Sequence, residues 1–570
     1  KVGPVKLRRI GKERVAVLIP VVEGPRTRLH SVVVDGTEQL GTQEVLRASG
    51  LMRNQAFSYV ALEQARLQVV ELYQERGYMF AKVTPSVRFS RDRTRAEVRV
   101  HVNERFQVHI DRILIRGAER TNDALVRRVM TLEPGDIFRP SEARESERQL
   151  ASLGVFTGVS VTMQEPELDA RIKSVIVTLS ERRNQFLDFS AGVSTGQGVR
   201  GGFEYGYRNL FGEAVSLTLR VQFAYKLFFV DQEFEDRFRQ LEAVEDQLER
   251  RISLGASIPR TPGLGPVRTS VDLVHLRDNE RDFGLDKNGV GLTFTHSPIE
   301  FLTLTLGGDL ENNNVDLFEG QALQDFLADD DTPPRLRRLL RVPEGTSTLV
   351  AARTSASYDR RNSAFTPTRG YFITLTGELA RTLTSDPDEF DTEVDQFISR
   401  FVKLGASGSA YLPVAGEVVL AGQARIGRIV HLIDDSQTYP NRAFFLGGVD
   451  TMRGFLEDEL VPQDIAEEII GDSELNPNTI VRAGDAFVLY RGELRFPLYG
   501  QLRGGVFTDL GNLWADPSNL DPFQVRPTAG LGLRLATPVG PIALDYGFNL
   551  KRRAALGERS GALHFSIGLF

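Results

Sequence analysis

Hydrophobic and polar residues alternate with two different periods along this chain, and the change of period divides it near residue 184. Before that point, short alternating runs are interrupted by stretches in which apolar residues recur every three to four positions, as on one face of a helix. After it, the alternating runs are long. In Ala214–Tyr225, for example, the odd-numbered positions are apolar and the even-numbered ones are mostly polar. The sequence therefore predicts an α+β region followed by an all-β region.

The α+β region contains the same order of elements twice, and repeats of this kind indicate a modular architecture. Each unit is predicted as β-α-α-β-β, which gives domains at residues 27–104 and 105–183. In the first unit we expect elements at Leu29–Val34, Thr42–Ser49, Tyr59–Arg76, Phe80–Phe89 and Arg95–Val102. In the second we expect them at Phe106–Ile115, Asn122–Leu132, Ser141–Leu153, Phe156–Met163 and Arg171–Leu179.

Residues 1–26 are predicted to contain two strands, at Val5–Ile10 and Val15–Val22. Two strands alone cannot bury a core. They match the last two strands of one repeat, so we interpret them as the C-terminal strands of a truncated further repeat.

Residues 184–570 are predicted to form sixteen antiparallel strands with one apolar face each. Strands of about 9–11 residues with this alternation are typical of a transmembrane β-barrel. The connections alternate in length, and the long ones follow odd-numbered strands. This asymmetry predicts short turns on the periplasmic side and long loops outside. The strands are expected near 186–195, 199–209, 214–225, 251–259, 267–277, 288–296, 301–312, 347–358, 370–380, 396–411, 416–428, 484–496, 501–508, 526–535, 541–549 and 562–570.

The amino-acid composition argues against several classes of function. A net charge of −7 argues against a general nucleic-acid binder. The chain has no cysteine, so it has neither disulfides nor thiolate metal sites. The histidines lack ligand spacing. We therefore expect no enzyme activity, no metal and no cofactor.

One stretch carries a candidate site: GGVDTMRGF, from Gly447 to Phe455. Gly447, Gly448 and Gly454 permit backbone angles that form a tight loop, which would present Arg453 at its tip. A guanidinium offers five donors in a fixed fork and stays charged, so it favours carboxylate partners. The alternative is a solvated arginine on a surface turn. Two long connections also show helical patterns, at 231–251 and 335–340, which predict a helix on the barrel rim or a partner-docking helix.

Seven segments in order resemble the superfamily of outer-membrane assembly and translocation barrels with periplasmic POTRA domains, of the BamA and TamA type. The segments are RNLFGE at 208–213, YDRRNSAFTPTRGYF at 358–372, FFLGGVDTMRGF at 444–455, RGELRFPL at 491–498, FTDLGN at 507–512, GLGLRLATPVGPIALDYG at 530–547 and HFSIGLF at 564–570. Together with the repeats they span nearly the whole chain.

The resemblance implies that Arg453 lies in the barrel lumen and contacts Glu493 and Asp509 on the inner wall. Alternation agrees, because Glu493 shares a strand face with two other charged residues. If the hairpin turn is Pro497–Gly500, Glu493 pairs near Gly504 and Asp509 near Val488. The two acids would then lie roughly 16 Å apart along the strands. This register predicts that Arg453 reaches one acid at a time, with Glu493 favoured, unless tilt or a bulge closes the gap.

The resemblance also implies a weak seam between the first and last strands, at Phe186–Thr195 and Leu563–Phe570. A client strand would add to the edge that opens there. Glycines at this seam would weaken the pairing. Phe570 is out of phase with the apolar face of the last strand. The seam residues are Phe186, Phe189, Gly192, Phe565, Ile567, Gly568 and Phe570.

The function implied is the folding and insertion of β-barrel clients into the outer membrane of a Gram-negative bacterium. Its partners would be unfolded outer-membrane clients, periplasmic lipoproteins or chaperones at the POTRA domains, and outer-membrane lipid. The alternatives are autotransporter assembly of the TamA type and a polypeptide secretion pore of a two-partner system. The secretion pores usually carry two POTRA units, so the additional strands at 1–26 favour assembly.

Overall fold

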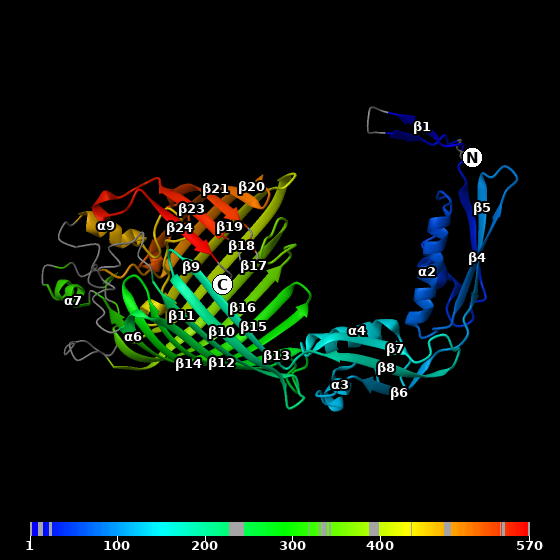
Figure 1. Cartoon of the computed structure of the whole chain (residues 1–570), viewed down its shortest axis with the longest axis horizontal. Coiled ribbons are helices and arrows are strands. Elements are labelled where there is room, and N and C mark those ends of the chain that lie inside the picture. The colour runs from blue at the N-terminus through cyan, green and yellow to red at the C-terminus, as the bar shows by residue number, and fades with distance from the viewer. Residues whose placement is uncertain are drawn as a thin grey trace. The chain divides into compact units, whose positions relative to one another are not determined.

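The structure is a computed structural model, and its elements fall into two compact units, Lys1–Arg182 and Arg183–Phe570 (Figure 1). The described residues are 3–9, 15–21, 25–226, 244–318, 320–329, 332, 339–340, 342, 344–386, 398–434, 436–471, 480–535, 537 and 542–567.

The first unit contains a two-stranded sheet and two repeats with the predicted element order. The small sheet pairs β1 (Lys6–Arg9) with β2 (Val15–Leu18). In each repeat the last strand is central, parallel to the first and antiparallel to the second, giving the orders β3-β5-β4 and β6-β8-β7. The elements are β3 (Arg28–Asp35), α1 (Thr42–Ala48), α2 (Tyr59–Glu75), β4 (Lys82–Phe89), β5 (Arg95–Asn103), β6 (His109–Arg116), α3 (Asp123–Val129), α4 (Pro140–Ser152), β7 (Phe156–Met163) and β8 (Ile172–Glu181).

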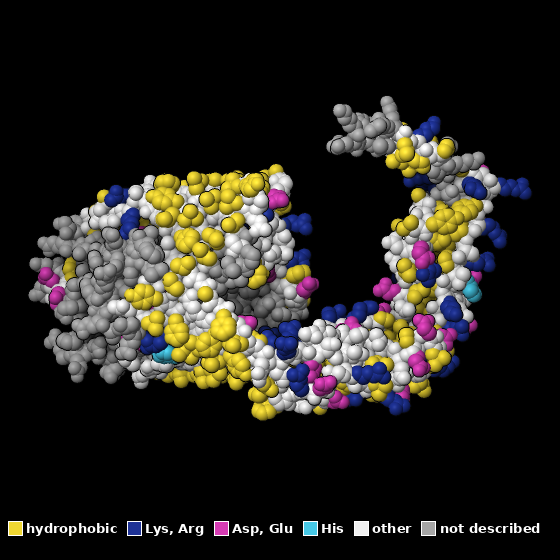
Figure 2. Space-filling model, in the orientation of Figure 1, with side chains coloured by type: hydrophobic (Ala, Val, Ile, Leu, Met, Phe, Trp, Pro, Cys, Tyr) yellow, Lys and Arg dark blue, Asp and Glu magenta, His cyan; other side chains and the backbone are white. Residues whose placement is uncertain are grey.

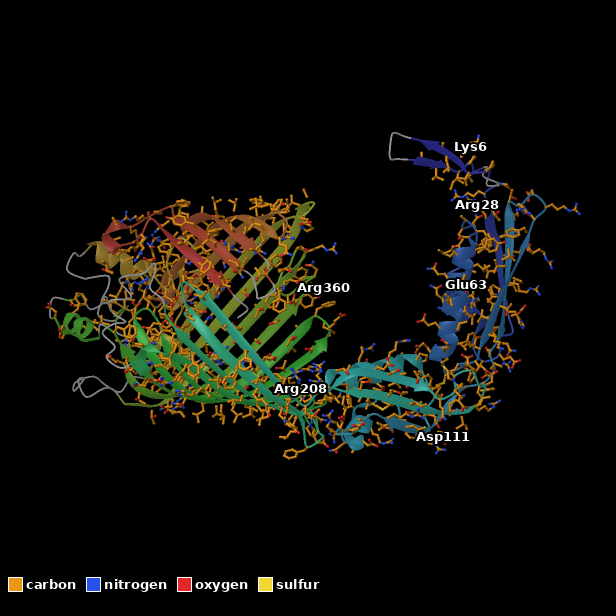
Figure 3. All side chains as sticks on the ribbon, in the orientation of Figure 1. Lys6, Arg28, Glu63, Asp111, Arg208 and Arg360 are labelled. Atoms are coloured by element: carbon orange, nitrogen blue, oxygen red, sulfur yellow. The ribbon has the colours of Figure 1, made fainter. Side chains whose placement is uncertain are left out.

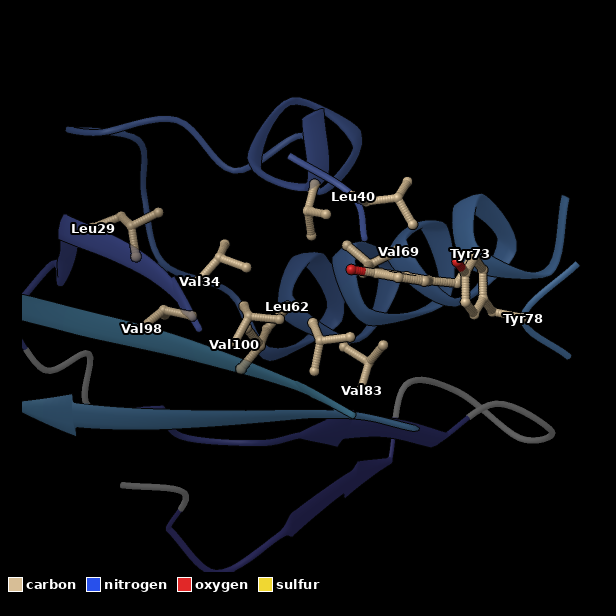
Figure 4. Close-up of a cluster of buried hydrophobic side chains, with 12 residues drawn as sticks. Leu29, Val34, Leu40, Leu62, Val69, Tyr73, Tyr78, Val83, Val98 and Val100 are labelled. Atoms are coloured by element: carbon tan, nitrogen blue, oxygen red, sulfur yellow. The ribbon is translucent and has the colours of Figure 1, made fainter. Parts of the chain in front are cut away.

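Strict alternation on β5 creates the core of the first repeat. Ala96, Val98, Val100 and Val102 are at most 2% exposed, while the residues between them face solvent. Helix α2 supplies Val69 and other apolar residues from the opposite side, so the helices and the sheet bury one shared layer (Figure 4). Burial of this layer is the main stabilising term for a domain of this size.

A buried glutamate closes each repeat at the end of its central strand. Glu104 accepts hydrogen bonds from the backbone N–H of Gln39 at 2.8 Å and from the Tyr73 hydroxyl at 2.8 Å. In the second repeat, Glu181 accepts from the backbone N–H groups of Arg120 and Thr121 at 3.0 and 2.9 Å. Each carboxylate therefore connects the last strand to the loop before the first helix.

The second unit is a closed antiparallel barrel of sixteen strands, which confirms the predicted fold class (Figure 1). All sixteen predicted strands are present. They are β9 (Gln185–Ser194), β10 (Gly198–Leu210), β11 (Val215–Tyr225), β12 (Glu249–Ile258), β13 (Val267–Asn279), β14 (Phe283–Ile299), β15 (Leu302–Leu317), β16 (Gly345–Asp359), β17 (Gly370–Asp386), β18 (Arg400–Ala415), β19 (Val418–His431), β20 (Ala486–Tyr499), β21 (Leu502–Trp514), β22 (Arg526–Leu535), β23 (Ile542–Asn549) and β24 (Gly561–Ile567).

The strands β14, β15, β17 and β21 extend beyond their predicted outer ends. The prediction ended β21 at residue 508, whereas the strand continues to Trp514. Polar residues such as Asp509 break the apolar pattern there because they face the lumen, not because the strand ends. Of the predicted loop helices, residues 231–243 and 333–338 lie outside the described residues. The neighbouring described helices are α6 (Val244–Gln247) and α7 (Gly320–Ala328).

Apolar side chains gather in patches on the face of the barrel that Figure 2 shows. The outward positions of β11, for example, include Leu217 and Phe223, which are 38% and 43% exposed. In the described part of the chain, no helix is both long and apolar enough to cross a membrane.

Loops at the outer end of the barrel share a small apolar core, which we call the outer cap. Helix α9 (Gln463–Gly471) contributes Ile465, Ala466 and Ile469. They pack with Leu323 of α7 and with Leu556, which lies between β23 and β24. The outer cap therefore joins three separate connections into one packed cluster.

Candidate functional site in the barrel lumen

The candidate motif lies on the connection from β19 to β20, residues 432–485, which we call loop 6. Gly447 and Gly448 have φ values of +130° and +91°, a region that favours glycine. Thr451 closes the turn, since its Oγ1 donates to the Gly447 carbonyl at 2.6 Å. Gly454 allows close approach to the wall: a Cβ there would lie 2.6 Å from Cγ2 of Thr528.

This turn places Arg453 inside the barrel, where it is 1% exposed. Its Nε and Nη2 donate to the two carboxylate oxygens of Asp509 at 2.9 and 2.7 Å, and its backbone N–H donates to Oδ2 at 3.1 Å. Its Nη1 donates to Oε2 of Glu493 at 2.9 Å. The fork of one guanidinium thus contacts both predicted acids, and Asp509 receives most of the bonds.

Further charges and an aromatic ring complete the site. The Arg453 guanidinium carbon lies 3.4 Å from the centroid of the Phe507 ring, a cation–π contact. Arg491 donates to Asp509 at 3.3 Å and also to the carbonyls of Val449 and Asp450 at 2.9 Å. The motif residues Met452 and Phe455 are buried in an apolar cluster with Leu489 and other neighbours.

The predicted register of the β20–β21 hairpin is wrong by three residues. Glu493 pairs with Phe507, and Asp509 pairs with Arg491. The hairpin turn lies at residues 500–501, because Tyr499 pairs with Leu502 after an irregularity next to Pro497. Glu493 and Asp509 are therefore neighbours along the wall, which is why one arginine contacts both.

Sequence reasoning missed two further arginines that anchor loop 6. Arg442, 6% exposed, contacts Glu311 of β15 and Glu378 of β17, the latter at 3.1 Å. Near the other end of loop 6, Arg482 donates to Asp282 at 2.6 Å. Each partner lies at least 64 residues away in sequence, so no local pattern identified these pairs. Loop 6 is thus held at three points around the lumen.

Loop 6 also contacts the last strand. Nε2 of His564 on β24 lies 3.1 Å from the Arg453 carbonyl oxygen. A Cβ on residue 547 of β23 would lie only 2.1 Å from the same oxygen, so glycine is required at this contact. The arginine site is therefore connected to the strand at which the barrel closes.

Among the described residues, β9 and β24 close the barrel through few backbone contacts. Among the described residues, Val193 pairs with Ile567 and Ser194 with Ser566, and the N–H of Thr195 donates to the Phe565 carbonyl at 2.9 Å. In contrast, β9 forms ten registered pairs with β10.

Three further predicted seam residues, Phe186, Phe189 and Gly192, pair with β10, and among the described residues none of them pairs with β24. Phe189 is 79% exposed. The Phe186 ring packs over Gly206 and beneath Arg208, whose guanidinium carbon is 3.9 Å from the ring centroid (Arg208 is labelled in Figure 3). Gly568 and Phe570 lie outside the described residues. Among the described residues, the pairing between β9 and β24 therefore lies at the outer end of β9.

A serine, a histidine and an aspartate also meet at the start of loop 6. His431 contacts Asp485 through Nε2 at 2.7 Å and Ser436 through Nδ1 at 2.9 Å. However, the Ser436 hydroxyl also accepts from the Arg400 N–H at 2.8 Å and reaches the Arg400 carbonyl at 3.1 Å. The hydroxyl is engaged by backbone, so we interpret the group as a structural link between loop 6 and β18.

The fold and the site define a class: a membrane-spanning β-barrel that follows α+β repeats and holds an inserted loop by an arginine in its lumen. A family model described as the Omp85 superfamily domain matches residues 183–570. A second, the POTRA model described as the surface antigen variable number repeat, matches residues 27–105 and 108–182. The chain belongs to the Omp85 superfamily, in agreement with the resemblance seen in the sequence.

Curated relatives and a solved structure agree with this assignment. The outer membrane protein assembly factor BamA of Nitratidesulfovibrio vulgaris is 24% identical over 98% of this chain and 64% of its own length. The protein of the same name from Neorickettsia risticii is 24% identical, covering 94% of this chain and 65% of the relative. The chain thus spans just under two thirds of their length.

The crystal structure of BamA from Haemophilus ducreyi lacking POTRA domains 1–3 covers 95% of this chain and 99% of its own, at 18% identity and a TM-score of 0.69. It shows the same fold. The protein is therefore an outer-membrane barrel with periplasmic POTRA domains.

Proposed function

We propose that this protein folds and inserts β-barrel clients into the outer membrane through the seam between β9 and β24. The observation that carries the proposal is the short closure of the barrel: the described residues form two registered pairs at the seam, against ten between β9 and β10. A junction with few hydrogen bonds would be the least costly place to open the barrel. An opened edge can accept a client strand by main-chain hydrogen bonding.

The arginine site would control this opening. Arg453 ties loop 6 to β20 and β21, while the Arg453 carbonyl meets His564 on β24. A loop seated in this way supports the last strand from the lumen. We infer that loop 6 holds β24 in its closed position and that a client must compete with this support.

The POTRA domains would receive the unfolded client and the accessory proteins. Each sheet has three strands, and the last strand in sequence is the central one, so β4 and β7 are edge strands. The edge strand β4 contains Pro85, which cannot donate to a ladder, whereas β7 contains no proline. We therefore expect β7 to be the better edge for strand addition by an extended client.

The seam is tested by a disulfide between Ser194→Cys and Ser566→Cys, two positions directly opposite each other. The chain has no native cysteine, so only the introduced pair can react. In vesicles that contain the purified protein, the oxidised variant should lose client insertion, and reduction should restore it. A matched control is Ser216→Cys with Ser257→Cys, which face each other on β11 and β12 and should insert clients normally when oxidised.

Insertion at the wild-type rate by a fully oxidised seam variant would contradict the proposal. The same experiment distinguishes a polypeptide secretion pore. A pore that passes chains through the lumen would be insensitive to the seam disulfide, but it would require loop 6 and the outer cap to move aside.

A further inference from the structure

Two arginines face each other on the lipid side of the barrel. Arg381 of β17 pairs directly with Arg400 of β18, and both side chains are exposed. Their orientation follows from their neighbours, since Ala380 and Phe401 are fully buried in the lumen and adjacent strand residues point to opposite sides. Among the described residues, neither guanidinium has an ion-pair partner.

Apolar residues surround this pair on every side. Leu379 and Leu383 flank Arg381 along β17, and Val350 pairs with it on β16. Ile398 precedes Arg400, and Leu432 is hydrogen-bonded to it on the far side. These five residues are 39% to 53% exposed, so they belong to the outer apolar surface of the barrel. The two charges therefore lie within this surface and not beyond its edge.

The height of the pair is that of the outer headgroups. The apolar outward positions of β17 begin at Tyr371, roughly ten residues before Arg381. At about 3.3 Å per residue and a tilt of about 45°, Arg381 lies roughly 23 Å above that level. The apolar band of such barrels is about 25 Å tall, which places both guanidinium groups at its outer margin.

Two like charges directly opposite on a sheet repel each other, and the apolar surroundings screen them poorly. An anion between them would remove this cost. A phosphate monoester carries a charge of about −1.5 to −2 and accepts bidentate bonds from arginine, whereas a phosphodiester carries a charge of about −1. We propose that Arg381 and Arg400 form a binding site for a phosphate monoester headgroup of an outer-leaflet lipid.

The test measures lipid that stays bound to the full chain after extraction from vesicles, by native mass spectrometry. The vesicles contain phosphatidylcholine with either diphosphoryl lipid A, a phosphate monoester, or phosphatidylglycerol, a phosphodiester. We expect preferential retention of lipid A and a decrease of about tenfold in the Arg381→Gln/Arg400→Gln double variant. Arg400→Gln alone should show a smaller loss, which keeps the test usable if the double variant folds poorly.

The matched control is Arg428→Gln. Arg428 is also outward and exposed, but it faces Leu404 and Ala486 across its ladders, so its loss should leave retention unchanged. Equal retention by wild type and by the double variant would overturn the proposal, as would equal retention of both lipids.

A competing occupant is the connection between the two strands, residues 387–397, which contains five acidic residues and lies outside the described residues. Changing all five to amides should leave lipid retention unchanged. A rise in retention would mean that this segment occupies the arginines, and would overturn the proposal.

Discussion

At the scale of single residues, Arg453 illustrates why a buried charge can be a precise anchor. Its guanidinium is removed from bulk water, and removal from water is costly unless every donor finds a partner. Asp509 and Glu493 provide four hydrogen bonds to Arg453, and Phe507 covers its face. These contacts stabilise the charge of Arg453 and also hold the tip of loop 6 in one position.

Substitution Arg453→Ala should leave a folded barrel with a loosened loop 6. Breaking one partner of a buried pair costs about 3–5 kcal/mol, and we expect the lower part of this range because Arg491 still contacts Asp509. Arg442 still holds the first part of the loop, so new protease cleavage should fall after Gly447 and client insertion should weaken. Arg453→Lys should rescue only in part, because an ammonium lacks the fork.

The control for this prediction is Arg503→Ala, which removes an exposed pair with Glu417 and should change neither readout. If Arg453→Ala and Arg453→Lys both match the wild type in cleavage and insertion, Arg453 is not an anchor of loop 6.

At the scale of elements, alternation predicted every strand of the barrel because one face of each strand meets lipid. It could not predict where strands end beyond the lipid. There, polar residues such as Asn512 and the lumen-facing Asp509 resemble loop residues in the sequence although they belong to β21. The predicted register of the β20–β21 hairpin was also wrong, because alternation with a period of two residues does not reveal the one-residue irregularity beside Pro497.

The contact of Arg453 with Glu493 and Asp509 was predicted from the resemblance to the family, but the residues that support the site were not predicted. Arg442, Arg482 and His564 meet partners that only the closed barrel brings near. Their sequence neighbourhoods carry no signal, because the contacts depend on the order in which distant strands pair.

The POTRA repeats give a prediction on pH. Burial alone would raise the pKa of Glu104, but hydrogen bonds from Tyr73 and from the Gln39 and Leu40 amides outweigh it and lower the pKa. A lowered folded-state pKa means that the stabilisation is complete above the unfolded pKa of about 4.3 and is lost as pH falls through the folded pKa. Glu104→Gln should therefore destabilise the first repeat by about 1–3 kcal/mol at neutral pH and by less in acid.

The measurement is denaturant unfolding of residues 25–183 at several pH values. Glu97→Gln, an exposed glutamate on the same strand β5, is the control and should have little effect. A penalty for Glu104→Gln that stays constant down to acid pH would show that the carboxylate charge is not what stabilises the loop.

At the scale of the whole molecule, the barrel interior is obstructed on two levels. Loop 6 crosses the lumen between its arginine anchors, and the outer cap joins helices α7 and α9 with the connection before β24. Both arrangements favour assembly at the wall over passage through the centre, because a central path would require two packed structures to separate.

Ile465→Asp should open the outer cap. Ile465 is 1% exposed in the cap, and a carboxylate there would be buried without a partner, which is strongly unfavourable. In planar bilayers the variant should conduct ions more often than the wild type. Ile470→Asp is the control on the same helix: Ile470 is 51% exposed, so conductance should not change. Equal conductance of Ile465→Asp and wild type would mean that the outer cap does not restrict the passage of ions.

The short closure also has a consequence for the energy source of insertion. The Arg208 N–H donates to the Asn184 carbonyl, and the Thr195 N–H donates to the Phe565 carbonyl. The backbone N–H and C=O groups of even-numbered β9 residues therefore bond to β10, and those of odd-numbered residues point toward β24. Leu187 and Phe189 therefore direct backbone groups toward the seam, where they have no ladder partner among the described residues. Each such group in hydrocarbon costs several kcal/mol, and an incoming strand would recover that energy. We expect insertion to proceed without nucleotide or an ion gradient, and a requirement for either in the vesicle assay would contradict this.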